Sequence, residues 1–235
     1  MPTTRTEAIA PSYEATVVVP DDPSGHGVVL YQEIFGVNDF LLAKAAALAD
    51  EGYVVSCPDV FWRVQPGVTL PHDQAGLEEG FGLVQRWSAE VADADKVEDL
   101  RSALTHLRGL PEVTGKVAAM GYCLGGTLAY RTAANADVDA CVSYYGSGVA
   151  DLLAAGERPT CPTMFHFGGQ DPFLPTEQVE AIRRGFADRD DVEVHVQPGA
   201  GHAFENFLSP QFSNPDAAAV SWPLTVEFLA ETFGA

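Results

Sequence analysis

The sequence predicts an α/β fold with a mostly parallel central sheet and helices on both faces. Short apolar runs alternate with segments of helical periodicity along almost the whole chain, and this alternation is typical of parallel strands joined by helices. Most of the runs are continuously apolar, as expected for strands that are buried on both faces. Glycine and proline mark the joins, for example at Pro58, Pro111 and Pro210.

Each strand is predicted from such a run, and each helix from apolar residues three and four positions apart. Predicted strands cover residues 15–19, 27–32, 53–57, 116–120, 140–145, 163–167 and 192–197. Predicted helices cover residues 39–51, about 77–87, 93–107, 124–135, 176–187 and 215–233. In the helix at 93–107 one stripe is apolar and the opposite side is charged, so this helix is expected to pack on the sheet.

Length and charge limit the class of protein. A chain of 235 residues with 46% hydrophobic content can bury one large core, so a single domain over residues 1–235 is predicted. The formal net charge of −20 repels phosphates and anionic lipids, which argues against nucleic acids and membranes as partners. The acidity fits a well-solvated surface or adaptation to salt. No targeting or membrane-spanning segment is recognisable, so a cytoplasmic location is expected.

The four cysteines lack C-x-x-C pairing and lie in or beside apolar runs, which suits a reducing compartment. Cys57, Cys141 and Cys161 are interpreted as core thiols. Cys123 differs, because it lies in Gly121-Tyr122-Cys123-Leu124-Gly125 between a predicted strand and a predicted helix.

This G-x-C-x-G segment has the pattern of the nucleophile elbow of an α/β-hydrolase fold, with sulfur in place of the usual serine oxygen. The sharp turn forces its middle residue into strained backbone angles, and the flanking glycines avoid Cβ clashes. At the N-terminus of the following helix, negative charge is favoured, which stabilises a thiolate or an oxyanion. Cys123 is therefore predicted to be a nucleophile.

In this fold a carboxylate and then a histidine follow the nucleophile, each on a loop after a later strand. Asp171 follows the strand at 163–167, and His202 follows the strand at 192–197. Either alone has a plain structural interpretation, as a turn cap or a core histidine. Together and in order they predict a triad in which His202 moves the proton and Asp171 orients the imidazole. His166 and His195 are interpreted as structural, and neither a metal nor an organic cofactor is predicted.

From about Gly27 to the C-terminal helix the chain resembles the dienelactone hydrolase family, the carboxymethylenebutenolidases. The matching motifs are Gln32-Glu33-Ile34-Phe35-Gly36-Val37-Asn38, Cys57-Pro58-Asp59, Gly121-Tyr122-Cys123-Leu124-Gly125-Gly126, Tyr144-Tyr145-Gly146, Gly168-Gly169-Gln170-Asp171 and Gly199-Ala200-Gly201-His202-Ala203-Phe204. The resemblance implies the same triad, with Glu33 as a further carboxylate that contacts the resting cysteine. It also implies an oxyanion hole made by the backbone N–H groups of Ile34 and Leu124. Without the resemblance, Glu33 would be interpreted as a helix cap or a partner of loop amides.

The chain departs from the family at two substrate contacts. Family members that act on dienelactone hold its carboxylate with two arginines, and the corresponding positions here are Leu77 and Asn206. Arg63 and His72 are the nearest candidates for a replacement charge. A carboxylate in a low-dielectric pocket needs such a charge, so neutral or apolar substrates are expected. The residues predicted to line the pocket are Leu77, Phe81, Tyr145, Phe204, Asn206 and Phe207.

The expected function is cleavage of a small ester or lactone, such as a dienelactone-like enol lactone, through an acyl-cysteine intermediate. A monomer or small homo-oligomer is expected, with the small-molecule substrate as partner. One alternative is a broader carboxylesterase or thioesterase that acts on neutral or apolar esters. Two others are an inactive ligand-binding relative and a thiol sensor, although no resolving cysteine lies near Cys123 in sequence.

Overall fold

The computed structural model describes residues 2–234 and divides into two compact units, with the boundary between Val117 and Ala118. The expectation of one domain over residues 1–235 stays a prediction, and the first and last of these residues lie outside the described part. No helix within residues 2–234 combines the length and the apolar character needed to cross a membrane.

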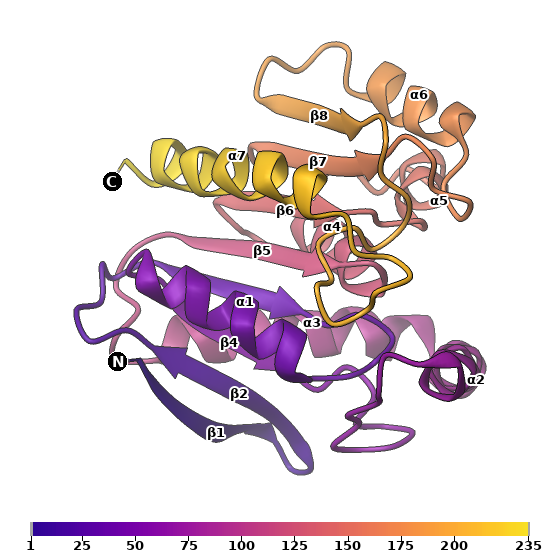
Figure 1. Cartoon of the computed structure of the whole chain (residues 1–235). Helices are drawn as coiled ribbons and strands as arrows, with labels where there is room; N and C mark the ends of the chain where they lie inside the picture. The colour runs from indigo at the N-terminus through magenta and orange to yellow at the C-terminus, as the bar shows by residue number, and fades with distance from the viewer. Residues whose placement is uncertain (1, 235) are drawn as a thin grey trace. The chain divides into compact units, whose positions relative to one another are not determined.

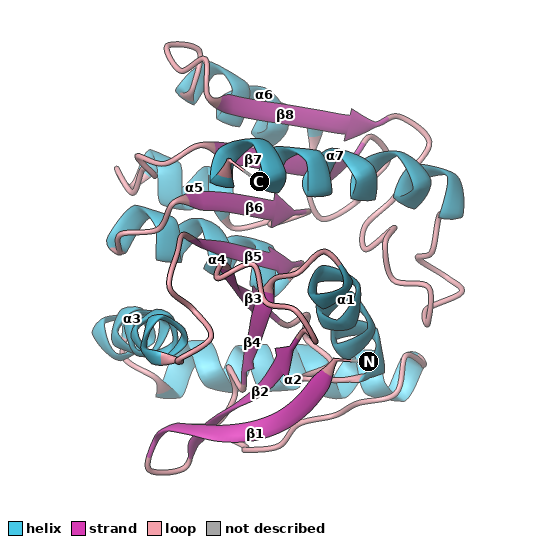
Figure 2. Ribbon diagram, turned by 90° about the vertical axis from the view of Figure 1, so that its left-hand side faces the viewer, coloured by secondary structure: helices cyan, strands magenta, loops and turns pink. Residues whose placement is uncertain are grey.

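The first unit holds four strands in the order β1-β2-β4-β3 (Figure 1). Strands β3 and β4 pair in parallel, whereas β1 and β2 extend the unit as antiparallel strands. Helices α1 and α3 lie on opposite sides of β3 and β4 (Figure 2). The bounds are β1 Thr3–Ala10, β2 Tyr13–Val19, β3 Gly27–Tyr31, α1 Asp39–Asp50, β4 Val54–Pro58, α2 Gln74–Glu90 and α3 Asp93–Gly109.

The second unit is built on four strands that all pair in parallel, in the order β5-β6-β7-β8. Helices α4 and α7 cover opposite faces of these strands (Figures 1 and 2). Because the strands are parallel, the loops at their carboxyl ends meet at one edge. The bounds are β5 Val117–Tyr122, α4 Leu124–Asn135, β6 Ala140–Tyr144, α5 Val149–Ala154, β7 Thr163–Gly168, α6 Thr176–Gly185, β8 Val192–Gln197 and α7 Pro215–Phe233.

The core of the second unit fixes β7, the strand that leads to Asp171. Every residue of β5, β6 and β7 is buried. Phe165 of β7 stacks on Phe167 at 5.8 Å between ring centroids and contacts Tyr130 of α4 at 6.0 Å. Such aromatic packing contributes several kcal/mol through area burial, so the end of β7 is rigidly supported.

Two elements were not predicted, β1 and α5. Strand β1 has the sequence TTRTEAIA and is mostly exposed or half-buried, so it lacks the apolar run by which the other strands are recognised. Its structure comes from the antiparallel pairing with β2, which begins at Thr3 opposite Val19. Helix α5 has only six residues, too few for an amphipathic period to be visible.

Candidate active site

Cys123 lies in the turn between β5 and α4, with φ of 56° and ψ of −115°. A positive φ is strained for a residue with a side chain, and close packing of the turn imposes it. A Cβ atom on Gly121 would lie 2.2 Å from the carbonyl oxygen of Gly125, and one on Gly126 would lie 2.3 Å from that of Tyr144. The backbone N–H of Cys123 donates to the same Tyr144 oxygen at 3.0 Å. These contacts hold the thiol at the N-terminus of α4.

The structure brings Cys123, His202 and Asp171 into one hydrogen-bonded chain. The Nε2 atom of His202 lies 3.1 Å from Sγ of Cys123, and its Nδ1 atom lies 2.7 Å from Oδ2 of Asp171. The other carboxylate oxygen, Oδ1, accepts the backbone N–H of Phe173 at 2.8 Å. Asp171 and His202 are both buried. This geometry allows the imidazole to take a proton from the sulfur while the carboxylate stabilises the resulting cation.

The charges of the neighbouring side chains favour the protonated form of His202. Burial alone would lower the pKa of His202, since it penalises the imidazolium form. The negative charge on the Cys123 sulfur and the hydrogen bond to Asp171 outweigh burial and raise the pKa of His202 to about 10. With this raised pKa the imidazole of His202 favours its protonated form at neutral pH.

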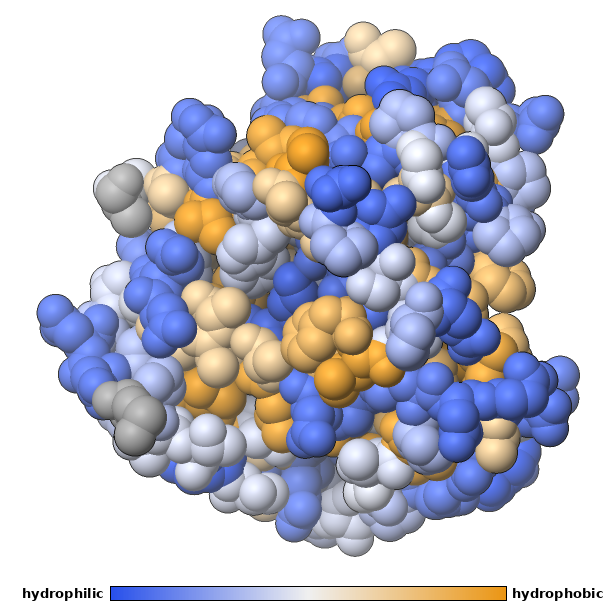
Figure 3. All heavy atoms as spheres, viewed as in Figure 1, coloured by the Kyte–Doolittle hydropathy of each residue, from blue (hydrophilic) through white to orange (hydrophobic). Residues whose placement is uncertain are grey.

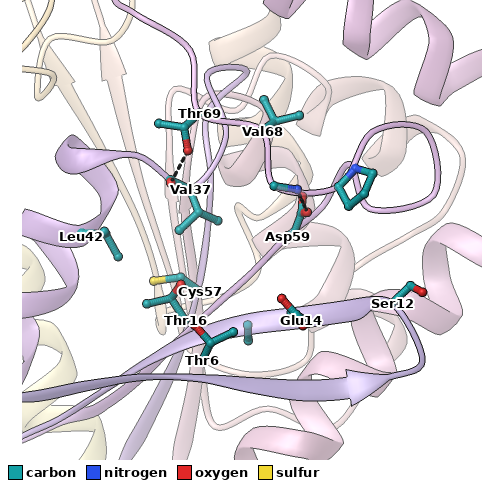
Figure 4. A pocket seen from close by; sticks show the side chains of 13 residues that line it. Thr6, Ser12, Glu14, Thr16, Val37, Leu42, Cys57, Asp59, Val68 and Thr69 are labelled. Atoms are coloured by element: carbon teal, nitrogen blue, oxygen red, sulfur yellow. Dashed lines mark hydrogen bonds between the residues drawn. The ribbon is translucent and has the colours of Figure 1, made fainter.

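The other three cysteines are buried, free thiols, in agreement with their interpretation as core residues. Burial raises the pKa of Cys57 to about 12 and that of Cys161 to about 11, and it raises the pKa of Cys141 strongly. All three therefore stay protonated at neutral pH and are poor nucleophiles. Cys57 lines a pocket of about 250 Å³ in the first unit, together with Glu14, Asp59, Val37 and Thr69 among others (Figure 4).

Aromatic rings surround the imidazole of His202. The rings of Tyr145 and Phe173 lie 5.2 and 5.0 Å from it. Tyr145 is fully buried, as is Phe204, which meets it edge-on, so these two predicted pocket residues support His202 from below the surface. Phe173, by contrast, is 45% exposed. The sequence interpretation missed Phe173, although its place two residues after Asp171 could have indicated it.

Phe207 and Leu208 follow on the loop after His202, with exposures of 54% and 38%. The face of the molecule seen in Figure 3 carries several hydrophobic patches among hydrophilic surface. Asn206 is buried, and its side-chain oxygen accepts the N–H of Leu208. Asn206 thus helps to shape this loop, and its predicted contact with substrate stays a prediction.

In the first unit, Glu33 and Ile34 are buried in the loop after β3. On α2, Leu77 is half-buried and Phe81 is exposed. The expected contact of Glu33 with the cysteine, the oxyanion hole of Ile34 and Leu124, and substrate contacts of the two α2 residues stay predictions. Leu124 is the first residue of α4, where backbone N–H groups have no acceptor within the helix.

Neither Arg63 nor His72, the two candidates for a replacement positive charge, offers an unpaired cation in the structure. Arg63 forms two hydrogen bonds to the carboxylate of Asp99, at 2.7 and 2.8 Å. His72 bonds to the side chain of Asn38, and burial lowers the pKa of His72, so its ring is neutral at pH 7. Arg63 is therefore committed to an ion pair, and His72 supplies no cation.

Similar solved structures show the fold class. A dienelactone hydrolase from Klebsiella pneumoniae, itself described as putative, is similar with a TM-score of 0.81 and 22% identity, over 98% of this chain and 99% of that one. An α/β serine hydrolase homologue from Coxiella burnetii has a TM-score of 0.61 and 17% identity, over 88% and 91% of the two chains. The prediction of an α/β-hydrolase fold, with a mostly parallel sheet and helices on both faces, is confirmed.

Sequence comparison gives the family within that class. The model of the dienelactone hydrolase family matches residues 13–233. The carboxymethylenebutenolidase of Pseudomonas putida is 37% identical over 220 residues, which is 93% of this chain and 91% of that enzyme. Carboxymethylenebutenolidase 1 of Cupriavidus pinatubonensis is 33% identical, over 90% and 88% of the two chains. The chain belongs to the dienelactone hydrolase family and is a carboxylic ester hydrolase.

Proposed function

We propose that this enzyme cleaves small, uncharged enol or aryl esters and lactones, with Cys123 as the nucleophile. The observation that carries the proposal is the chain of hydrogen bonds from the Cys123 sulfur through His202 to Asp171, at 3.1 and 2.7 Å. Nucleophile, base and orienting carboxylate at such distances are the arrangement that covalent acyl transfer requires.

The reaction begins when the Cys123 thiolate attacks the carbonyl carbon, and the carbonyl electrons move onto the oxygen. The N–H of Leu124, with that of Ile34 as the proposed second donor, stabilises this oxyanion. Collapse of the intermediate breaks the bond to the leaving alcohol or enol, which takes the proton from His202 and leaves an acyl-cysteine. His202 then accepts a proton from water as the water attacks the thioester, and the acid product leaves with the thiol regenerated.

The leaving group restricts the substrate. A thiolate is itself a good leaving group, so an intermediate that carries a poor alcohol expels sulfur and returns to substrate. Enol and aryl oxygens depart more readily because their negative charge is delocalised. The same argument applies to an enol lactone, whose leaving oxygen stays tethered to the acyl group.

The charge of the site favours uncharged substrates. The sequence from residue 190 to 235, which includes the loop of His202, contains neither lysine nor arginine. Arg63 is held by Asp99, and the pKa of His72 is lowered. A carboxylated lactone would therefore enter an apolar site without a countercharge, at a cost of several kcal/mol. We propose a broader esterase that accepts neutral substrates, rather than an enzyme restricted to carboxylated dienelactone.

The test compares the wild-type enzyme with Cys123→Ala and, as a matched control, Cys161→Ala. Wild type and the control should hydrolyse a neutral aryl ester, and mass spectrometry of the quenched reaction should find one acyl group on the peptide that contains Cys123. Cys123→Ala should lose both signals and keep the melting temperature. Wild-type turnover in Cys123→Ala would refute the nucleophile, and a higher kcat/KM for carboxylated dienelactone than for its neutral ester would refute the substrate class.

A further inference from the structure

A second carboxyl group is buried near the candidate site, three residues after His202. Glu205 is only 2% exposed, and the hydroxyl of Ser221 on α7 donates a hydrogen bond to it. Neither residue belongs to the triad. Burying a carboxyl group is costly unless it is hydrogen-bonded, so a Glu at this position of an irregular loop needs a physical reason.

Glu205 is one end of a buried polar network beneath α7. The hydroxyl of Tyr144 lies 3.2 Å from the carbonyl oxygen of Ser221 and 2.6 Å from Oγ1 of Thr225. The same Oγ1 atom lies 3.0 Å from Nε2 of His166. Burial lowers the pKa of His166 to about 3, so the ring is neutral at pH 7. The network therefore ties α7 to two neighbouring strands, β6 and β7, by side-chain hydrogen bonds.

The network reaches the nucleophile through β6. Tyr144 is the residue whose carbonyl oxygen receives the N–H of Cys123. In the parallel register, Tyr144 lies beside Tyr122 on one side and His166 on the other. Its ring stacks on that of His166 at 4.4 Å between centroids. The carbonyl oxygen that binds the N–H of Cys123 and the hydroxyl that contacts α7 therefore belong to the same residue, Tyr144, whose ring is fixed by this stacking.

The other end of the network lies on the loop of His202. Ala203 has a φ of 52°, a strained conformation that persists only where surrounding contacts hold it. Two buried residues follow, Phe204 against the ring of Tyr145 and Glu205 against Ser221. Phe204 gives an apolar contact without direction, whereas the Glu205 hydrogen bond fixes the loop at one point along α7.

We propose that Glu205 is a positioning residue for catalysis: its hydrogen bond to Ser221 fixes the loop of His202 on α7, in register with the Cys123 elbow that the same network holds through Tyr144. The consequence for catalysis rests on the function proposed above. The predicted effect on the distance between the imidazole and the sulfur is independent of that function, because this distance affects the reactivity of the thiol whether or not an ester is the substrate.

The test uses four variants of the full-length enzyme. Glu205→Met removes the acceptor and has a side-chain volume close to that of glutamate, whereas Glu205→Gln keeps an acceptor oxygen. Ser221→Ala removes the donor with a minimal change in volume. Glu227→Met makes the same replacement at an exposed position of α7 and serves as the matched control. For each, the rate of Cys123 alkylation by iodoacetamide at pH 7, kcat and KM for a neutral aryl ester, and the melting temperature are measured.

We expect alkylation and kcat to fall at least tenfold in Glu205→Met and at least threefold in Ser221→Ala, with KM nearly unchanged. Glu205→Gln should stay within about threefold of wild type. A loss of stability alone would leave alkylation unchanged or raise it, because unfolding exposes the thiol. Folded Ser221→Ala with wild-type alkylation and kcat would overturn the proposal even if Glu205→Met does not fold. A wild-type enzyme that is alkylated normally but cleaves no ester would refute the proposed function and leave the alkylation test valid.

Discussion

Replacing Asp171 by asparagine tests how the carboxylate and the histidine share their proton. Both oxygens of Asp171 are used as acceptors, Oδ2 by His202 and Oδ1 by the N–H of Phe173. Asparagine has only one acceptor oxygen. If that oxygen keeps the Phe173 contact, the amide NH2 points at Nδ1 of His202 and selects the tautomer that carries its proton on Nε2. That tautomer cannot accept the proton of Cys123.

The size of the effect follows from the lost interaction. A buried hydrogen bond between imidazolium and carboxylate contributes about 1.5–3 kcal/mol. At about 1.4 kcal/mol for each factor of ten, its loss slows turnover by roughly 10- to 140-fold. The unfavourable tautomer adds to this loss, so we expect kcat to fall by about 100-fold or more in Asp171→Asn.

The pH dependence gives a second, independent readout. Removing the carboxylate charge takes away part of what raises the pKa of His202 to about 10, so the alkaline limb of the kcat profile should move to lower pH. The free energy of unfolding should also depend on pH through the pKa of His202. The raised pKa of His202 stabilises the wild-type fold fully below its ordinary value of 6.5, and that contribution is lost as the pH rises through about 10. Asp171→Asn should show a smaller loss of stability over this window.

The assay measures kcat against pH with a neutral aryl ester, and urea unfolding at pH 6 and pH 10. Asp188→Asn, which changes an exposed carboxylate of the same unit, is the control. A folded Asp171→Asn with kcat within threefold of wild type at every pH would refute the role assigned to this carboxylate.

Two further predictions concern packing and charge. Gly126→Ala places a Cβ atom 2.3 Å from the carbonyl oxygen of Tyr144 and should lower stability by at least about 2 kcal/mol in urea unfolding, whereas Gly82→Ala, with open space around it in α2, should be neutral or stabilise by up to about 1 kcal/mol. Equal urea midpoints for the two variants would contradict the steric argument. Arg63→Gln should leave the preference for neutral over carboxylated substrates unchanged, because this guanidinium is bound to Asp99; a tenfold rise in KM for the carboxylated substrate alone would show that it binds substrate.

Residues whose conformation is set locally could be predicted from the sequence. The elbow needs small residues around Cys123, and this need is visible as G-x-C-x-G with a further glycine at 126. The order of Asp171 and His202 after parallel strands follows from the sheet, and the structure places Cys123, His202 and Asp171 in one hydrogen-bonded chain. Strand β8 and helices α4 and α7 have the predicted bounds. Helix α7 has clear local signals at both ends, since the side chain of Asn214 caps its N-terminus and Gly234 ends it in the left-handed conformation.

Features that depend on contacts between distant segments have no local sequence pattern by which they could be predicted. Glu205 lies in a loop without a periodic pattern, and only the fold shows that it is buried against Ser221. Arg63 seemed available as a substrate contact until the structure placed it on Asp99, 36 residues along the chain. The hydrogen bond from the N–H of Leu208 to the side-chain oxygen of Asn206 was also not visible in the sequence, and the substrate contact of Asn206 stays a prediction. Side-chain partners of this kind are selected by tertiary packing, which periodicity does not encode.

The unequal environments of the cysteines have a practical consequence. Because three of the four thiols are sealed in the interior with raised pKa values, mild electrophiles can distinguish one sulfur from the rest without any engineering. Covalent probes, spin labels or surface attachment would thus report from a single known place beside His202. The number of sulfurs that react is a direct measure of how much of a preparation is correctly folded.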